Sequence, residues 1–269
     1  MSAEAQDIIT SGQNPKIKHL VALQQKSALR REENCFVVEG QRELMHCVNG
    51  GYEIDSIFTI DKALTIDVIC SLALNGGATP YIYTVSEKVY EKIAYRGTTE
   101  GIIAVVKAKH PTLSDLKLQE NPLIVVLESV EKPGNLGAIL RSADAAGADA
   151  VIICDPLTDL YNPNLIRSSI GAIFTVPCVA CSSEECIEFL KERGIQILTA
   201  QLQDSSLYYD RDMKCGTALV MGTEATGLTN IWRKAADAHI RIPMLGRLDS
   251  LNVSVSTAIL LYEAVRQRQ

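Results

Sequence analysis

The sequence predicts an α/β protein with two domains. Strand-like and helix-like segments alternate along the chain, which is the arrangement of strands connected by helices. Short runs made only of apolar residues, such as residues 123–127 (LIVVL), indicate strands that are covered on both faces of a sheet. A polar stretch bracketed by prolines separates the two alternating halves. We therefore expect a domain over residues 1–109, a linker over 110–122 and a second domain over 123–269.

Length and composition are those of an ordinary globular protein. The chain has 269 residues, of which 47% are hydrophobic and 22% charged, and this length allows two compact domains. A net charge of −6 argues against a protein that coats nucleic acid through charge alone, but it permits one local basic face. No apolar run approaches the roughly 20 residues of a membrane helix, and the first residues lack the basic region of a signal peptide. We expect a cytoplasmic protein that has no membrane partner.

The eight cysteines predict reduced thiols. Most lie inside apolar runs, which is typical of buried thiols in a cytosolic protein. Cys178 and Cys181 form a C-x-x-C pair with Cys186 close behind, a pattern that can indicate a metal or redox site. No second cysteine pair and no nearby histidine accompany it, so the sequence favours no metal.

The first half of the chain predicts a small α/β domain. An apolar strand, CFVVE, ends at Gly40, and Ser86 is placed to cap a helix because its hydroxyl can accept from free backbone N–H groups. The expected strands cover residues 35–39, 54–60, 81–85 and 101–106, and the expected helices cover 41–48, 66–74 and 86–94.

Residues 14–31 (NPKIKHLVALQQKSALRR) predict one amphipathic helix with a basic face. Apolar residues recur at helical spacing from Ile17 to Leu29, and no acid lies between Asp7 and Glu32. A solvated helix face is one interpretation, and a landing site for RNA phosphates is the other. The basic residues of this segment are Lys16, Lys18, Lys26, Arg30 and Arg31.

The second half begins with a strand–helix–strand unit. After the strand at 123–127 we expect a loop over 128–135, a helix over 136–146 that is closed by Gly147, and a strand over 151–154. Only Gly134 and Gly137 stand in the loop and helix start, so the G-x-G-x-x-G fingerprint of dinucleotide binding is absent. Further helices are expected at 162–170, 184–193 and 232–236, and further strands at 174–179, 195–201, 217–221 and from residue 239.

Residues 240–269 predict a strand, a polar loop and a terminal helix that begins near Asn252. Apolar residues fall at helical spacing from Leu251 to Val265, and arginines occupy the last turn. The N-terminus of such a helix offers free N–H groups and the positive end of the helix dipole. Helix capping explains one polar residue here, but not the group of Ser250, Asn252, Ser254 and Ser256.

This C-terminal stretch, IPM-x-G-x-x-x-SLNVSV followed by LLYEAVRQR, resembles the third motif of the SpoU (TrmH) family of RNA ribose 2'-O-methyltransferases in the SPOUT superfamily. The segment from Glu131 to Ala143 resembles the first motif of that family, Asn-x-Gly-Ala-x-x-Arg. Gly222-x-Glu224 with a later Gly227 resembles the second motif, although alone it also suits a glycine turn with a first-turn glutamate. All three stand in family order, each after a predicted buried strand, where open α/β sheets bind ligands.

The resemblance implies a fold for each domain. It implies that the second domain is an α/β-knot methyltransferase domain with a deep trefoil knot, a topology that general rules of chain connection disfavour. FVVEG-x-REL, at residues 36–44, resembles the substrate-binding N-terminal domain of the family, which is similar to the ribosomal L30e fold. The resemblance also implies a homodimer formed through the C-terminal domain.

The resemblance further implies the reaction, transfer of a methyl group from S-adenosylmethionine to a ribose 2'-hydroxyl in RNA. The residues that would hold the cofactor are Gly222, Ile242, Leu251, Ala200 and Met244. Arg141 would activate the hydroxyl as a base or would hold phosphate and stabilise the alkoxide, and an ordinary arginine keeps its proton. The residues that would position it are Asn135, Glu224, Ser250 and Asn252. The methyl donor is already a sulfonium, so this chemistry requires no metal.

Other functions remain open at this stage. The presence of a separate N-terminal domain favours 23S rRNA as the substrate, and transfer RNA is the alternative within the family. A non-catalytic RNA-binding protein on the same fold is another possibility, against which the intact motif residues count. The missing glycine fingerprint counts against an ordinary nucleotide-dependent enzyme.

Overall fold

The structure is a computed structural model that describes residues 8–60, 62–74, 77–95, 100–247 and 250–269. The chain forms two compact units, an N-terminal unit of Met1–Lys109 with Asp159–Thr175 and a C-terminal unit of His110–Thr158 with Val176–Gln269. Residues 159–175, which the sequence placed in the second domain, thus fold with the N-terminal unit. The expected linker at 110–122 belongs to the C-terminal unit, where Leu113, Leu116 and Leu118 pack against the core.

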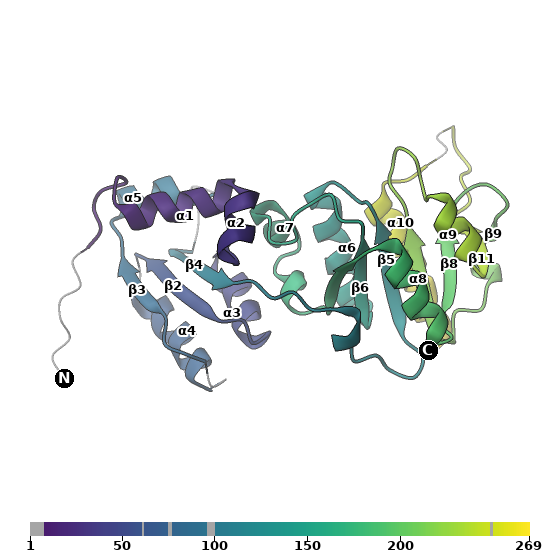
Figure 1. The fold of residues 1–269 in the computed structure, drawn as a ribbon, viewed down its shortest axis with the longest axis horizontal. Coiled ribbons are helices and arrows are strands. Elements are labelled where there is room, and N and C mark those ends of the chain that lie inside the picture. Colours follow the sequence, from purple (N-terminus) through teal and green to yellow (C-terminus); the bar gives the residue numbers. More distant parts are fainter. Residues whose placement is uncertain (1–7, 61, 75–76, 96–99, 248–249) are drawn as a thin grey trace. The chain divides into compact units, whose positions relative to one another are not determined.

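A mixed four-stranded sheet forms the N-terminal unit, in the strand order β1-β4-β2-β3 (Figure 1). Strand β4 runs antiparallel to both neighbours, and β2 and β3 are parallel. The strands are β1 (Cys35–Glu39), β2 (Ile54–Thr59), β3 (Tyr81–Thr84) and β4 (Ile102–Lys107). The helices are α1 (Pro15–Gln25), α2 (Ser27–Glu33), α3 (Gln41–Asn49), α4 (Lys62–Leu74), α5 (Glu87–Ile93) and α7 (Pro163–Ser168).

The predicted single helix at residues 14–31 is wrong, because the chain forms two helices that meet at Lys26. Lys26 has an extended conformation, with φ −112° and ψ 106°, and it ends α1. The apolar side of α1 still faces the core, where Ile17, Leu20 and Leu23 are buried against residues of α5. The break turns α2 away from the direction of α1, so the basic residues do not share one continuous helix face.

Arg30 is buried, which corrects its assignment to an RNA-binding surface. Its side chain is only 4% exposed, and its Nε lies 2.7 Å from Oδ2 of Asp159. The guanidinium also donates to the carbonyl of Leu23 at 2.6 Å. A buried charge is stable only when it is paired and hydrogen-bonded, and this guanidinium satisfies both conditions inside the unit. Arg30 therefore attaches residues 159–175 to the N-terminal unit and is not free for phosphate.

An aromatic cluster also connects residues 159–175 to strand β1 of the N-terminal unit. Tyr161 stacks on Phe36 of β1 with ring centroids 4.2 Å apart, and Phe174 stacks on the same ring at 5.9 Å. Phe174 lies in a short 3-10 helix, Ala172–Phe174, so the strand predicted at 174–179 is wrong at its start. The apolar run suggested a strand, but burial of Phe174 against β1 accounts for its hydrophobic character, and the strand begins at Cys178.

The C-terminal unit is built on a seven-stranded sheet in which all neighbouring strands are parallel, in the order β7-β6-β5-β10-β8-β11-β9. Its strands are β5 (Leu123–Glu128), β6 (Ala150–Cys154), β7 (Cys178–Cys181), β8 (Gln196–Ala200), β9 (Ser206–Leu207), β10 (Thr217–Met221) and β11 (Ala238–Arg241). Its helices are α6 (Pro133–Ala145), α8 (Ser183–Glu192), α9 (Asn230–Ala235) and α10 (Val253–Arg268).

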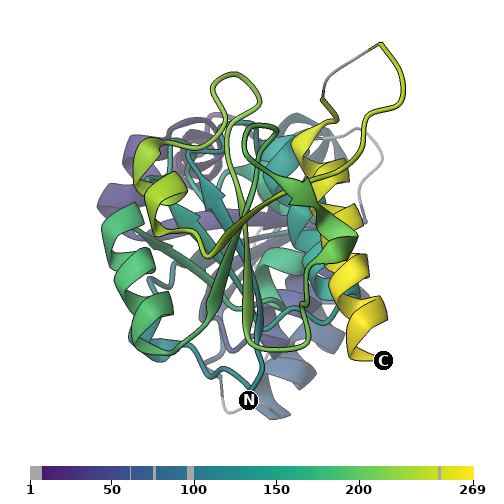
Figure 2. The same ribbon diagram turned by 90° about the vertical axis from the view of Figure 1, so that its right-hand side faces the viewer.

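Helices cover both faces of this sheet. Figure 2 shows α8 and α9 on one face and α6 with the yellow helix α10 on the other. Every residue of β5, β6 and β10 is buried, as the continuous apolar runs predicted. The strand order changes direction between β5 and β10, which is where open parallel sheets form ligand sites. Within the described residues, no helix is both long and apolar enough to span a membrane.

Candidate active site

Three segments that are far apart in sequence meet at the carboxyl ends of the central strands. The first segment follows β5 and opens α6, the second follows β10, and the third follows β11 and opens α10. Strands β5 and β10 are neighbours in the sheet, and α10 packs against both α6 and β10. The sheet therefore brings all three motif segments to one edge of the C-terminal unit.

Side-chain hydrogen bonds join the three segments. The amide of Asn135 donates to Oε1 of Glu224 at 3.0 Å. The amide of Asn252 donates to the same carboxylate oxygen at 2.9 Å, and it lies 3.1 Å from Oδ1 of Asn135. Each segment thus contributes one member to a closed triangle of polar side chains, which we call the motif triangle (Asn135, Glu224, Asn252).

The charge of Glu224 is stabilised by a lysine that the sequence did not identify as functional. Lys132, at the N-cap of α6, forms an ion pair with Oε2 of Glu224. The hydrogen bonds from Lys132 and then Asn135 lower the pKa of Glu224 below its ordinary value, and the backbone N–H of Val253 adds to this effect. The same contact raises the pKa of Lys132. Glu224 is consequently an anion at neutral pH, and its carboxylate accepts hydrogen bonds from the first and the third segment.

Helix termini fix the orientation of the two asparagines. Helix α6 begins at Pro133, earlier than predicted, so Asn135 lies in its first turn and the expected loop over 128–135 is wrong at its end. Asn252 is the N-cap of α10, as expected, and its Oδ1 accepts from the backbone N–H of Ser254 at 2.9 Å. Its amide group is thereby turned toward Glu224. The amide oxygen of Asn252 thus caps α10, while its amide nitrogen donates within the motif triangle.

The loop after β10 needs a glycine at its first position. A Cβ on Gly222 would lie 2.3 Å from the carbonyl carbon of Gly227 and 2.6 Å from the backbone nitrogen of Leu228. Hydrogen bonds between Thr223 and Gly227 close this loop, and Gly227 adopts a positive φ of 67°. The main chain of the second motif is therefore folded back tightly on itself at the strand end.

The proposed cofactor residues follow neighbouring strands. Ala200 ends β8, Gly222 follows β10 and Ile242 follows β11, and the three strands lie side by side in the order β10-β8-β11. Ala200, Gly222, Ile242 and Met244 are partly exposed, and Leu251 is 40% exposed. Partly exposed apolar side chains around a tight backbone loop can accept a flat, apolar ring. These positions consequently remain candidates for binding a nucleoside.

Arg141 and Ser250 lie outside the motif triangle. Arg141 is exposed on α6, and the described residues provide it with no hydrogen-bonding or ion-pair partner. Ser250 is exposed, and it adjoins residues 248–249, which lie outside the described part of the chain. The structure thus brings Asn135, Glu224 and Asn252 together, but it does not connect Arg141 or Ser250 to them.

The basic residues of the N-terminal unit have different surroundings. Lys18, Lys26 and Arg31 are exposed, whereas Arg30 is buried as described above. Lys16 is exposed, and its Nζ lies 3.8 Å from the ring centre of Tyr83, a cation–π contact. Four of the five predicted residues therefore offer charge at the surface of this unit.

Sequence reasoning missed two residues that hold the site. Lys132 lies within the segment that resembles the first motif, but its role depends on the ion pair with Glu224, which comes from another segment. Glu128 is 3% exposed, and its two carboxylate oxygens accept from the backbone N–H and the hydroxyl of Thr229. It thereby ties β5 to the start of α9, a contact that no local pattern reveals.

Known proteins resemble this chain along nearly its whole length. A 23S rRNA (guanosine(2553)-2'-O)-methyltransferase of Bacillus subtilis, RlmP, is 28% identical over 255 residues, which is 94% of this chain and 97% of the relative. The 23S rRNA (guanosine-2'-O-)-methyltransferase RlmB of Pseudomonas putida is 36% identical over 181 residues, covering 64% of this chain and 73% of the relative. An AdoMet-bound rRNA methyltransferase from Sinorhizobium meliloti superimposes with a TM-score of 0.88 and 31% identity, covering 97% of each chain.

Family profiles match both units. The MRM3-like substrate binding domain matches residues 14–104, and the SpoU rRNA Methylase family matches residues 122–262. The second match spans all three motif segments and more than half of the chain, and the resemblance read from the motifs is confirmed by it. On the strength of this match and of the motif triangle at the sheet edge, the chain belongs to the SpoU rRNA Methylase family.

Proposed function

We propose that this protein methylates a ribose 2'-hydroxyl of 23S rRNA with S-adenosylmethionine as methyl donor. The observation that carries the proposal is the motif triangle, because it joins the three segments of the family at the sheet edge where parallel α/β sheets bind ligands. The relatives from Bacillus subtilis and Pseudomonas putida are named 23S rRNA 2'-O-methyltransferases, and the solved structure from Sinorhizobium meliloti carries AdoMet. A transfer RNA substrate and a non-catalytic role are not favoured.

The cofactor would lie against Gly222, Ile242 and Leu251, with Ala200 and Met244 as neighbours. The tight turn at Gly222 leaves backbone groups without a covering side chain, which allows hydrogen bonding to an adenine edge or a ribose. Leu251 and Ile242 supply the apolar surface for a flat base. When bound, the sulfonium supplies an activated methyl group, and the residues of this chain orient the RNA hydroxyl toward it.

Arg141 has the role of holding the RNA at the reacting ribose. An arginine side chain offers only hydrogen-bond donors, so the chemistry of Arg141 is donation to a phosphate and stabilisation of the developing alkoxide. The exposed position on α6 and the lack of a partner among the described residues leave its donors available to RNA. The proton of the hydroxyl then leaves to a phosphate oxygen or to water rather than to Arg141.

The motif triangle positions the loops and does not react. Glu224 holds the first turns of α6 and α10 through Asn135 and Asn252, so both helix N-termini keep a fixed place beside the cofactor loops. Ser250 precedes this junction and is exposed, which suits a contact with RNA or cofactor. Removing the carboxylate would separate the segments while leaving the sheet intact.

A homodimer through the C-terminal unit completes the proposed site. Helix α10 exposes large apolar side chains, since Val255 is 47% and Tyr262 is 51% exposed. A second copy that covers this side would bury them, and Arg141 of one subunit would then serve the site of the other. We also propose the trefoil knot for this unit, as the family resemblance implies.

The N-terminal unit has the role of binding RNA. We propose an L30e-like fold for it and assign phosphate contacts to Lys16, Lys18, Lys26 and Arg31, which are exposed. Arg30 is left out because it is buried in an ion pair. We propose a cytoplasmic location, where such a substrate is assembled.

The basic surface can be tested by RNA binding. Replacing Lys18, Lys26 and Arg31 by alanine should weaken binding and reduce the salt slope by roughly 2 to 3, because each phosphate contact contributes about 0.7 to 0.9. A control variant removes three exposed lysines of the C-terminal unit, Lys117, Lys191 and Lys214. Filter binding across a salt series compares the two, and equal slopes for both variants would show that the basic surface is only solvated.

The reaction itself can be tested in cells. Mass spectrometry of total RNA from a strain without the gene should reveal one missing ribose methyl group in 23S rRNA. Expression of the wild-type protein should restore it, and expression of Arg141→Ala should not. An unchanged methylation pattern in the deletion strain, or a missing methyl group in transfer RNA alone, would refute the proposed substrate.

A further inference from the structure

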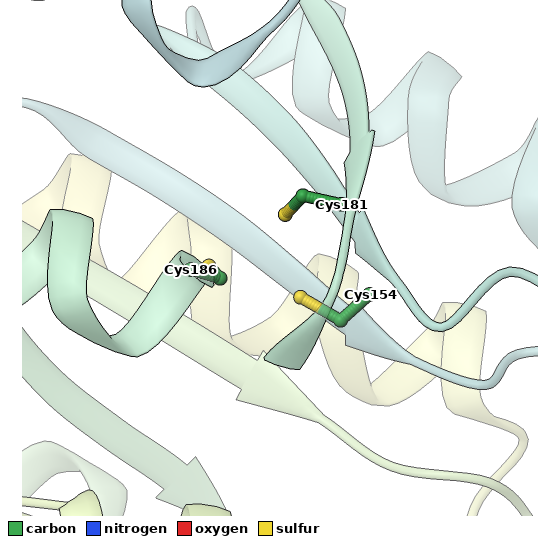
Figure 3. Close-up of side chains that lie close together, drawn as sticks. All are labelled: Cys154, Cys181 and Cys186. Atoms are coloured by element: carbon green, nitrogen blue, oxygen red, sulfur yellow. The ribbon is translucent and has the colours of Figure 1, made fainter. Parts of the chain in front are cut away.

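Three cysteines of the C-terminal unit converge outside the proposed active site. Cys154 ends β6, Cys181 ends β7, and Cys186 lies in the second turn of α8. Their sulfur atoms all lie within 4.8 Å of one another, and Figure 3 shows the three side chains turned toward a common space. Cys178, which the C-x-x-C pattern had suggested as a partner, is not in this group.

Parallel strand pairing creates the cluster. Cys154 and Cys181 are directly paired in the register of β6 and β7, so their side chains leave the sheet on the same face. Cys186 reaches them from α8, which covers that face and starts just after Cys181. Cys154 is 27 positions before Cys181, so no local spacing pattern could have included it.

Core packing explains part of this arrangement. Cys181 directly precedes the N-cap of α8, and Cys186 is the fourth residue of that helix. Apolar residues at these two positions often pack together and fix the angle at which the chain enters a helix. Any pair of small apolar residues would satisfy that contact. The third thiol, Cys154, is not required by it, so the presence of three sulfur atoms calls for a further reason.

The geometry suits a single metal ion. Three sulfur atoms that each lie about 2.3 Å from one ion are roughly 3.8 to 4.0 Å from each other at tetrahedral or trigonal angles. The observed limit of 4.8 Å is close enough for small side-chain rotations to reach this geometry. No histidine or carboxylate among the described residues joins the group.

The donor set selects the kind of ion. Thiolates favour soft ions such as Cu(I) and Zn(II), and structural zinc takes four protein ligands. Cys154 and Cys186 are fully buried, which disfavours water as a fourth ligand. Three sulfur ligands without a fourth therefore favour Cu(I) over Zn(II).

We propose that Cys154, Cys181 and Cys186 form a three-sulfur binding site for a soft closed-shell cation, with Cu(I) preferred over Zn(II). Binding of one ion releases one proton to solvent for each thiol that becomes a thiolate, and all sulfur atoms keep their oxidation state, so no oxidant is needed. The site ties the ends of β6 and β7 to the start of α8. Methyl transfer does not depend on it.

The test is anaerobic titration of the reduced full-length protein with Cu(I) and, separately, with Zn(II). We expect one tightly held Cu(I) per chain, a higher melting temperature of the complex, and three sulfur neighbours by X-ray absorption. Cys181→Ser, which changes the partly exposed member, should weaken Cu(I) binding at least tenfold and abolish the melting shift. A control variant with Cys70→Ser and Cys215→Ser, both exposed and outside the cluster, should bind as the wild type does.

Several results would overturn the proposal. Unchanged Cu(I) affinity in Cys181→Ser would place the ion elsewhere, and fewer than three sulfur neighbours in the wild-type complex would exclude the site without any substitution. Tighter binding of Zn(II) than of Cu(I) would refute the preferred ion. If the wild-type protein takes up neither ion, the three thiols have only a packing role.

Discussion

Replacing Gly222 by alanine tests whether the close backbone turn after β10 is needed for the reaction. The new Cβ would lie 2.3 Å from the carbonyl carbon of Gly227, and ordinary contact begins at 3.4 Å, so the difference is 3.4 − 2.3 = 1.1 Å. The neighbouring atoms are backbone, so a side-chain rotation cannot remove the overlap and the loop must move by about that distance. A misplacement of about 1 Å can lower a catalytic rate about 100-fold, which corresponds to about 2.7 kcal/mol.

The assay combines methyl transfer with calorimetry of S-adenosylmethionine binding. Gly222→Ala should lower kcat/KM about 100-fold and weaken cofactor binding, while a thermal melt should show a loss of stability within the roughly 1 to 3 kcal/mol typical of overpacking. Gly134→Ala is the matched control, because a Cβ there meets no atom of the described residues within 4 Å. Wild-type kcat/KM in Gly222→Ala would refute the reasoning, since it would mean that this turn does not position the cofactor loops.

Further predictions concern the motif triangle, the buried arginine and the dimer. Because the folded-state pKa of Glu224 is lowered from its ordinary 4.5, its contacts should persist above that value and be lost as the pH falls through the lower folded-state pKa. Cofactor affinity should therefore be flat from neutral pH to about 4.5, and Glu224→Gln should weaken it at all of these values; a loss near pH 7 in the wild type would contradict this. Arg30→Ala should destabilise the protein by roughly 3 kcal/mol in denaturant unfolding, because it leaves Asp159 unpaired, and an unchanged midpoint would count against the buried ion pair. Val255→Glu should shift sedimentation toward the monomer and lower activity, and an intact dimer would show that this side of α10 is not the interface.

The parts of the fold that depend on local pattern could be predicted from the sequence. The buried strands of the C-terminal unit and the capped helices α5 and α10 follow from continuous apolar runs and from single capping residues, Ser86 and Asn252. The break at Lys26 could not be predicted, because no glycine or proline marks it and the apolar spacing continues through it. Beyond this break, α2 places Arg30 in a buried ion pair with Asp159, a contact between residues far apart in the sequence.

Contacts between distant segments explain the remaining differences. Phe174 was expected in a strand because it starts an apolar run, but its ring is buried against Phe36, a residue far earlier in the chain. Lys132 was assigned no role from the sequence, because its importance depends on Glu224, which the sheet brings from another motif. The resemblance to a family predicted which residues should lie close together. The structure shows the hydrogen bonds that connect three of them, Asn135, Glu224 and Asn252.

The most direct test of the central claim is methyl transfer in vitro with purified protein. Unmodified 23S rRNA, purified from a strain without the gene, is incubated with S-adenosylmethionine carrying a labelled methyl group, and the product is digested and mapped by mass spectrometry. We expect a labelled methyl group on one ribose 2'-oxygen with the wild-type protein, and none with Arg141→Ala, which should still bind the cofactor in calorimetry. A labelled base instead of a ribose, or full turnover by Arg141→Ala, would contradict it.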